Sequence, residues 1–502
     1  MCPKGDSVHA QGLSEIQSNV FVTFTFFPQT IAFVMSGSES PRRHLAARVP
    51  SLQQDPAHLI LQSKPLLRYI LIISFCAFPL GWDLGTTGNL MDLPSFRARL
   101  NVSAQVTGVL ISVFNVGCIC ACTLLFVTKS TQRLGHLMLF RVCHVVFLFG
   151  SAISLCSLTG GPSSLYLYSI GRMFQGASAG ALCVIGPIYI SHISTFSSMN
   201  VAFLALFQVI VALFVFLGNC LFIYTGVYSE LIFCVLTVLV PIFALICLTC
   251  LPESPREILI LGDPRRFRKT LDKLLVDMDK DETWICALHV LKTSLFGETA
   301  RAEKNTLDKR RLAVCCILSF LQQMSGATFF FYFGKTMFDL LVVVSSPVKF
   351  SGLLLSVCNL AGTTISGFLV RLRGARMPLF SGLILLSALI LAFATMGIVV
   401  KIDGTTLLGI PMLVTSCFYL FVFATTWGPC TAVLSMEISQ ADERIMSCLV
   451  ICGWATNVLV VSLFPLLVDR CGLGAMYVFL FFTFILIWVT RKDFFAPLMP
   501  LN

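Results

Sequence analysis

The sequence predicts an all-α protein that crosses a membrane with twelve helices, arranged as two groups of six. Two observations carry this prediction. First, 56% of the 502 residues are hydrophobic and 12% are charged, which is below the roughly 25% charged residues usual in soluble domains. Second, the apolar residues form long blocks, and a spanning helix needs roughly 20 apolar residues. This composition excludes a disordered chain, a fibrous repeat and a soluble disulfide scaffold.

The first 65 residues are predicted to form a tail rather than a span. Within this tail the stretch 20–35 is apolar, but it is short and Pro28 interrupts it. A signal peptide would start closer to Met1, behind a basic end. We therefore count no membrane span before residue 66.

Twelve apolar blocks follow the tail, and short polar breaks separate them. Each block is long enough to cross the bilayer once. The predicted spans are 66–88, 106–127, 137–158, 165–190, 201–225, 231–251, 312–339, 351–370, 378–400, 407–436, 446–468 and 474–490.

One long polar segment, residues 252–311, divides the spans into a first half, 66–251, and a second half, 312–490. The segment carries charges of both signs, in patterns such as Asp263–Lys273 and Asp277–Glu282. Such patterns indicate short amphipathic helices that lie on a membrane surface. A short tail, 491–502, follows the last span.

The distribution of Lys and Arg predicts the orientation in the membrane. The segment from Arg256 to Arg311 carries thirteen of them, and the loops that begin at Lys129 and Arg371 carry more. All of these lie on one side if the spans alternate, and basic loops are typical of the cytoplasmic side. Both termini are then cytoplasmic, and the Asn101-Val102-Ser103 sequon, which predicts a glycoprotein, lies outside.

Several functions are not indicated. The net charge of +10 comes from loops rather than from a basic stripe, so we expect no nucleic-acid partner. The 21 cysteines are scattered through apolar blocks without zinc spacing, and we interpret them as packing residues. The chain has no hydrolase triad, phosphate-binding loop or HExxH motif. We therefore expect no enzymatic activity, no cofactor and no metal site.

Asp83 is a carboxylate deep within the first predicted span. Intramembrane charged groups are expensive and tend to mark a functional path. Because an unpaired buried carboxylate is strongly disfavoured, Asp83 is expected either to bind a proton or to have a partner that fixes the first span. The sequence leaves both interpretations open.

Amide side chains recur within several predicted spans. Gln322 and Gln323 are adjacent in the seventh span, and an amide both donates and accepts hydrogen bonds, which suits a neutral polyhydroxyl ligand. In the eleventh span Trp454 lies at helical spacing from the amide of Asn457 and is suited to stack on a sugar ring. The alternative is that the amides bridge helices. The remaining candidates are Gln208, Asn359, Asn457 and Trp454.

Five segments resemble one known family. They are Gly81-Trp82-Asp83-Leu84-Gly85-Thr86, Gly171-Arg172, Pro252-Glu253-Ser254-Pro255-Arg256, Gln322-Gln323-Met324-Ser325-Gly326 and Phe423-Ala424-Thr425-Thr426-Trp427-Gly428-Pro429. The chain resembles the sugar porters of the major facilitator superfamily, and most closely the fungal hexose transporters. The resemblance implies the major facilitator fold, with two six-helix halves around a central sugar site. By motif position it implies sugar binding by Gln208, Gln322, Gln323, Asn359, Trp454 and Asn457.

The chain departs from the family pattern at two kinds of position. Near the sugar, Thr328 stands where the family usually has Asn, and Ala432 where it usually has an aromatic residue. At the cytoplasmic gate, Lys129, Arg371 and His192 replace acidic residues. The resemblance assigns gating roles also to the charged residues that remain, which are Arg172, Glu253, Arg256, Glu437 and Arg444. Replacing acids by bases turns attraction into repulsion, so we expect a weaker cytoplasmic gate.

These features lead to a functional hypothesis. The chain is expected to be a plasma-membrane transporter of a monosaccharide, a glucose-like hexose, that works by alternating access. Facilitated diffusion is favoured over proton symport, although a proton remains a candidate partner because of Asp83. The alternative is a non-transporting sugar receptor or a degenerate paralogue, since the cavity residues are kept while the gate residues are changed.

Overall fold

The computed structural model describes residues 64–100, 104–159, 161, 163–194, 200–225, 228–260, 264–274, 308–340, 350–403 and 408–491. The apolar stretch 20–35, the Asn101 sequon, the segment 275–307 and the C-terminal residues 492–502 lie outside this set. Within the described residues every regular element is a helix, as the composition predicts.

The first half contains the first six predicted spans. The first span is a broken helix, α5 (Lys64–Phe75) and α6 (Phe78–Asp92). The next five are α8 (Ala104–Thr128), α10 (His136–Cys156), α11 (Ser164–Ile193), α12 (Asn200–Tyr224) and α13 (Ser229–Cys247). Short connecting helices are α7 (Pro94–Leu100), α9 (Ser130–Leu134), η2 (Ser157–Thr159), η4 (Leu248–Cys250), α14 (Pro255–Ile260) and α15 (Pro264–Leu274).

The second half contains the other six predicted spans. The seventh is the broken pair α17 (Lys309–Gln323) and α18 (Ala327–Leu340), and the tenth is α21 (Gly409–Thr426) with α22 (Gly428–Ser439). The others are α19 (Ser351–Arg373), α20 (Arg376–Asp403), α23 (Glu443–Cys471) and α24 (Tyr477–Arg491), with η6 (Gly472–Met476) between the last two.

The helices are long and apolar enough to cross a membrane. Among the described residues ten segments meet this condition, and an eleventh does so if α17 and α18 form one bent span. The longest segment, Glu443–Ile485, contains two predicted spans, α23 and α24, because the chain turns at Gly472 with φ 66°. The prediction of a twelve-helix membrane protein is therefore confirmed.

Local sequence explains where several spans begin and break. Asp308 and Asp442 each accept hydrogen bonds from two backbone N–H groups that follow them, so each caps the first turn of a span. Pro79 and Pro429 lie in the first turn of the second piece of their spans, where proline is tolerated because that turn needs no N–H donor. Gly326, with φ 92°, lies at the break in the seventh span.

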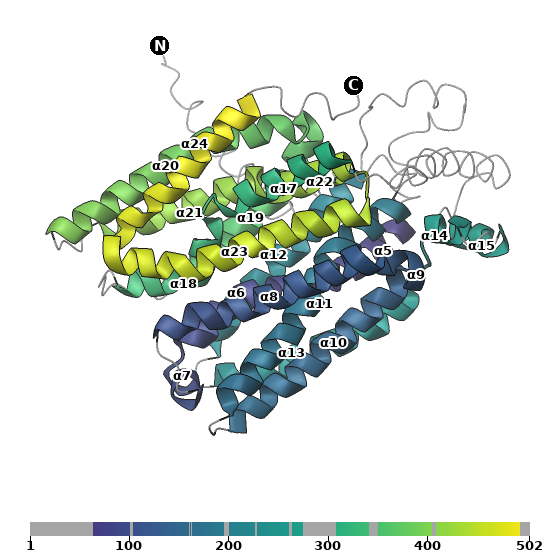
Figure 1. The fold of residues 1–502 in the computed structure, drawn as a ribbon, viewed down its shortest axis with the longest axis horizontal. Coiled ribbons are helices and arrows are strands. Elements are labelled where there is room, and N and C mark those ends of the chain that lie inside the picture. The colour runs from purple at the N-terminus through teal and green to yellow at the C-terminus, as the bar shows by residue number, and fades with distance from the viewer. Residues whose placement is uncertain are drawn as a thin grey trace, which may run out of the picture. The chain divides into compact units, whose positions relative to one another are not determined.

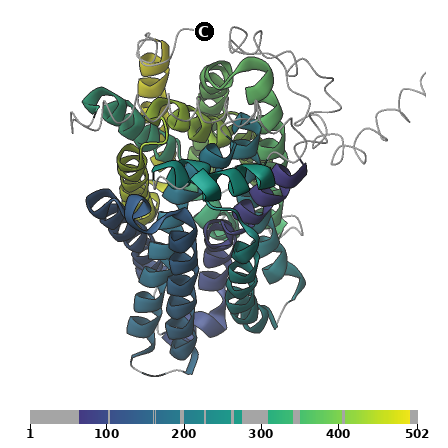
Figure 2. The same cartoon turned by 90° about the vertical axis from the view of Figure 1, so that its right-hand side faces the viewer.

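The two halves lie against each other in the described part of the chain. Figure 1 shows the purple-to-teal helices of the first half below the green-to-yellow helices of the second. The main contacts between the halves are α8 with α23, α12 with α19, and α6 with α18. We call the end of the bundle that carries Lys129, His192 and α14 the linker end, and the opposite end, which carries Asn89 and Asn219, the far end. Figure 2 looks onto the linker end, where the short linker helices cross the ends of the spans.

Glycine allows the closest helix contacts inside the first half. At Gly176 of α11 an added Cβ would lie 1.9 Å from the carbonyl oxygen of Phe114 in α8, which no real side chain tolerates. Small residues at helix contacts are the usual way in which membrane helices approach each other closely. The position of Phe114, which contributes to the site described below, therefore depends on this glycine.

Candidate functional site

A buried charge pair and the tyrosine that binds it link the helices α6, α11 and α18, between the middle of the bundle and its far end. Asp83 and Arg172 are 3% and 5% exposed, and an Arg172 Nη2 group donates to Asp83 Oδ1. The hydroxyl of Thr87 donates to the same oxygen over 2.8 Å, and the hydroxyl of Tyr332 donates to Asp83 Oδ2 over 2.9 Å. Three donors therefore compensate the carboxylate. Because Tyr332 belongs to α18, this cluster also joins the two halves.

An aromatic path leads from this charge pair to the second half. The Arg172 guanidinium lies 4.6 Å from the centre of the Phe114 ring, a cation–π contact. Phe114 in turn meets Trp454 of α23 edge to face, with ring centroids 6.1 Å apart. The side chain of Cys183 in α11 also lies close to Trp454. Trp454 is thus held between the halves by residues of the first half.

Hydrogen bonds join α8 and α23 at mid-span. Asn115 Nδ2 donates to Asn457 Oδ1 over 3.0 Å, and both side chains are buried. About one turn further towards the far end, the hydroxyls of Ser112 and Ser462 lie 2.7 Å apart. Asn457 and Trp454 are three residues apart and so share a face of α23. This face is directed at the first half.

The amides of the seventh span approach the same turn of α23. A Cβ added at Gly453 would lie 2.7 Å from Ser319 Oγ, so glycine allows the close approach of Ser319, and 3.9 Å from Gln323 Nε2, so Gln323 lies within van der Waals reach of the same turn. The hydroxyl of Thr328 donates to Gln323 Oε1 over 2.8 Å. Thr328, which departs from the family pattern, therefore still supplies a polar group that orients Gln323.

The other predicted amides lie on neighbouring surfaces. Gln208 is half-buried in α12 and Asn359 is buried in α19, and these two helices face each other across the halves. They meet where a Cβ at Gly367 would lie 3.1 Å from Ala205 Cβ, and Gln208 lies about one turn beyond Ala205 towards the far end. Gln322 is half-buried. The structure thus brings Gln323, Thr328, Trp454 and Asn457 to one turn of α23, while Gln208 and Asn359 lie at a second contact.

The halves touch at the far end. A Cβ added at Gly88 of α6 would lie 2.7 Å from the carbonyl oxygen of Tyr332, and one at Gly352 of α19 would lie 2.8 Å from Asn219 Oδ1. Asn219 Oδ1 also accepts a hydrogen bond of 3.0 Å from Asn89 Nδ2. The far end is therefore closed by backbone and amide contacts.

The halves also touch at the linker end. Glu443, at the start of α23, accepts hydrogen bonds from the backbone N–H of Thr131 over 3.2 Å and from the Thr131 hydroxyl. Lys129 adopts the left-handed conformation, with φ 50°, directly before helix α9. This bend turns the first N–H groups of α9 towards Glu443. A carboxylate at that position is stabilised by hydrogen bonds from the backbone.

His192 and Arg256 form a second contact at the linker end. Arg256 Nη1 lies 3.1 Å from His192 Nε2, and Ser254 Oγ lies 3.4 Å from His192 Nδ1. Because a guanidinium has no acceptor, His192 Nε2 accepts the bond and carries no proton. Burial lowers the pKa of Arg256, and the charge of Asp442 acts in the opposite direction. His192, at the position where the resemblance implies an acid, is therefore a neutral acceptor.

The remaining gate candidates have different surroundings. His136, which is not one of these candidates, lies at the start of α10 and contacts Glu257 of α14 through its ring and through its backbone N–H, over 2.9 Å for the latter. Arg371 and Arg444 are half-buried, and Glu253 and Glu437 are exposed. Arg172 lies with Asp83 and not with the charges at the linker end.

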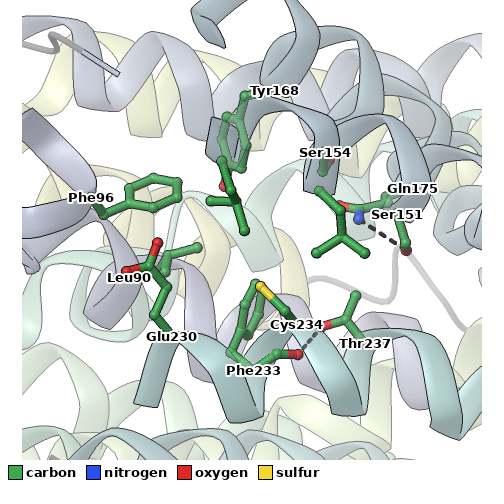
Figure 3. Close-up of a pocket in the computed structure, with 12 residues that line it drawn as sticks. Leu90, Phe96, Ser151, Ser154, Tyr168, Gln175, Glu230, Phe233, Cys234 and Thr237 are labelled. Carbon is green, nitrogen blue, oxygen red and sulfur yellow. Dashed lines mark hydrogen bonds between the residues drawn. The ribbon is translucent and has the colours of Figure 1, made fainter. Parts of the chain in front are cut away.

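Two small cavities lie outside this central region. One, in the first half, is drawn in Figure 3, where Gln175 donates to Ser151 on one side of the cavity and Glu230 lies on the opposite side. The other lies at the far end beside Asn89 and Asn219. Each has a volume of ≈ 20 Å³, which holds about one water molecule. Neither accommodates a hexose.

Sequence reasoning missed several residues of this site. Asn115 is an amide within the second span, and the rule that found the other amides would also have found it. Tyr332 and Glu443 carried no such signal, because their partners, Asp83 and Thr131, are more than 200 residues away in the sequence.

Known proteins resemble the chain in sequence and in fold. Over 469 residues it is 25% identical to the low-affinity glucose transporter HXT4 of Saccharomyces cerevisiae, covering 85% of this chain and 79% of the relative. The high-affinity hexose transporter HXT6 of the same yeast is 26% identical over 444 residues, with 82% and 75% covered.

Solved structures share the fold. The proton:xylose symporter XylE bound to 6-bromo-6-deoxy-D-glucose superposes with a TM-score of 0.72 at 17% identity, covering 86% of this chain and 96% of that one. XylE from E. coli in a partially occluded inward-open conformation gives a TM-score of 0.70 at 17% identity, with 85% and 97% covered. The expected major facilitator fold is confirmed.

Residues 69–496 match the model of one protein family. This range includes the polar segment between the halves and all twelve predicted spans except the first three residues of the span 66–88. The family is one of transporters rather than enzymes, in agreement with the absence of catalytic motifs in the sequence. The chain belongs to the Sugar (and other) transporter family.

Proposed function

We propose that the chain transports a monosaccharide, a glucose-like hexose, by alternating access. The observation that carries this proposal is the meeting of the two halves at mid-span through polar side chains, with contacts at both ends. One turn of α23 carries Trp454 and Asn457. Gln323, which Thr328 orients, lies against this turn from the seventh span. An amide and an indole so placed are suited to a sugar ring that has hydroxyls at its edge and apolar faces.

Each end of the bundle is closed by contacts that are small enough to break during transport. The far end relies on the Tyr332 bond and close backbone packing, and the linker end on Thr131 and Glu443. Alternating access requires that these two sets open in turn around a fixed site. The linker-end contacts support a working gate, although its charges differ from the family pattern.

Facilitated diffusion is the coupling that we propose. Asp83 has three hydrogen-bond donors in a buried cluster, which favours a structural role over a proton carrier. The test is a sugar-dependent proton current, measured in parent and Asp83→Asn proteins. A current that Asp83→Asn abolishes would overturn facilitated diffusion.

We further propose that the protein lies in the plasma membrane with both termini and the linker end in the cytoplasm. The excess of Lys and Arg at the linker end supports this orientation. Accessibility of tags placed at the termini, measured in intact and permeabilised cells, tests it. Tags that react in intact cells would contradict it.

Uptake of radiolabelled hexoses by cells that lack their own hexose carriers tests the transport function. The parent chain is expected to give saturable uptake, and Gln323→Ala to abolish it at unchanged surface amount, because the sugar loses a desolvated hydrogen-bond partner. Unchanged kinetics in Gln323→Ala would exclude the seventh span from the site. A parent chain that reaches the surface and transports no hexose would favour the receptor alternative.

A further inference from the structure

We infer that Asn115 is a sugar-binding residue that selects for one particular hydroxyl of the substrate. This inference rests on the proposed function, because it concerns the same central site. The amides found from the sequence come from the fifth, seventh, eighth and eleventh spans. Asn115 adds a sugar-binding amide from the second span, α8.

Asn115 carries a buried polar atom that has no hydrogen-bond partner among the described residues. Asn115 is 0% exposed, and the atom concerned is its Oδ1. A buried polar group left without a partner costs free energy, and such groups in proteins call for an explanation. One explanation is that a ligand forms the missing hydrogen bond with Asn115 Oδ1 in another step of the transport cycle.

Asn115 is also placed where the two halves meet. Asn115 lies near the middle of α8 (Ala104–Thr128), and its partner Asn457 lies near the middle of α23 (Glu443–Cys471). Its sequence neighbour Phe114 contacts Trp454. One turn before Asn457, Gly453 lies beside Gln323. Asn115 therefore reaches, from the first half, the turn of α23 that Gln323 approaches from the second.

The chemistry of the Asn115 amide suits a hydroxyl group. In the arrangement described, Nδ2 of Asn115 is used by Asn457 and Oδ1 is unpaired. If the carboxamide oxygen and nitrogen were exchanged, the unpaired atom would be an N–H donor at the same place. A sugar hydroxyl both donates and accepts, so it satisfies Asn115 in either orientation. A cation or an apolar ligand does not.

A functional consequence follows from the bond between Asn115 and Asn457. The two residues belong to different halves, and each has amide atoms for a ligand besides the bond that they share. A sugar that binds both residues strengthens the contact between the halves at mid-span. The site therefore distinguishes sugars by the hydroxyl that Asn115 binds, since a missing partner in a desolvated site is penalised more strongly than a missing apolar contact.

The experiment measures binding of glucose and its 1-, 2-, 3-, 4- and 6-deoxy analogues to the purified full-length protein, by competition against radiolabelled glucose. The variants are Asn115→Ser and Asn115→Leu, and thermal unfolding checks that each is folded. The matched control is Ser112→Ala, about one turn away on the same helix, which removes the hydrogen bond between Ser112 and Ser462.

We expect both Asn115 variants to bind glucose about five- to tenfold more weakly. They should bind one deoxy analogue as well as the parent does, because that analogue lacks the hydroxyl concerned. Ser112→Ala should change all affinities by the same factor. Equal weakening of all six sugars in the Asn115 variants, or no weakening of any, would overturn the inference. A parent that binds no sugar would instead refute the proposed function.

Discussion

The hydroxyl of Tyr332 is predicted to hold the far end closed. It donates to Asp83 over 2.9 Å, and both residues are 3% exposed. A hydrogen bond to a charged group contributes about 1.5–3 kcal/mol. Because Tyr332 and Asp83 belong to different halves, this contribution exists only while the far end is closed. Tyr332→Phe should therefore shift the equilibrium towards the far-open state by about ten- to hundredfold.

Labelling by a membrane-impermeant maleimide measures this shift. An Asn89→Cys reporter at the far end is followed by mass spectrometry of its own peptide, because the chain has 21 other cysteines. The matched control is Tyr419→Phe. Tyr419 is equally buried, but its hydroxyl donates to the carbonyl of Ser325 within the same half. If Tyr332→Phe labels no faster than Tyr419→Phe, the bond does not stabilise the closed far end.

Three further predictions follow from contacts between helices. Thr131→Ala should open the linker end and speed labelling of an introduced cysteine there, because Glu443 loses its hydroxyl donor. Thr123→Ala, on an exposed face of the preceding helix α8, should not, and equal rates would contradict the role of Thr131. Gly88→Val should prevent far-end closure and abolish uptake at normal surface amount, since even a Cβ would meet Tyr332 O at 2.7 Å; normal uptake would refute this. Gly176→Ala should strongly reduce the amount of folded protein at the cell surface, because its Cβ would lie 1.9 Å from Phe114 O. Gly428→Ala should be tolerated, because the nearest atom to its Cβ lies at 3.9 Å. Similar surface amounts of the two variants would contradict the role of glycine in helix packing.

The sequence was sufficient to predict the fold because each span is a local property. A block of apolar residues must bury its backbone polar groups within one helix, so the twelve spans could be recognised one at a time. Motif resemblance then supplied the arrangement of the halves. The break in the first span was not predicted, although Pro79 lies in the first turn after it.

The site could be predicted only in part, because its residues pair across long separations. Asp83 and the amide of Gln323 stand out as polar residues in apolar helices. Their partners Tyr332 and Gly453 do not, since their roles depend on how two helices meet.

The contacts at the linker end could not be predicted for a different reason. Counting side-chain charges indicates repulsion around Lys129 and His192. The structure instead uses a backbone N–H of Thr131 and a neutral imidazole. Neither group appears in a count of charges, and the left-handed bend at Lys129 that presents the N–H has no clear signature in a lysine.

The contact between α8 and α23 runs along most of both helices, and a rotation around its Asn115 bond moves the two ends of α8 by unequal distances. At about 1.5 Å per residue, the Asn115 bond lies about 10 Å from Gly108, which packs on Val461, and about 20 Å from the other end of α8 at Thr128. A rocking of about 10° around Asn115 would move the first point by about 2 Å and the second by about 3.5 Å. The first displacement can be absorbed by sliding, whereas the second is enough to break a hydrogen bond. A single small rotation would thus release the bond of Thr131 with Glu443 while the opposite arm stays in contact.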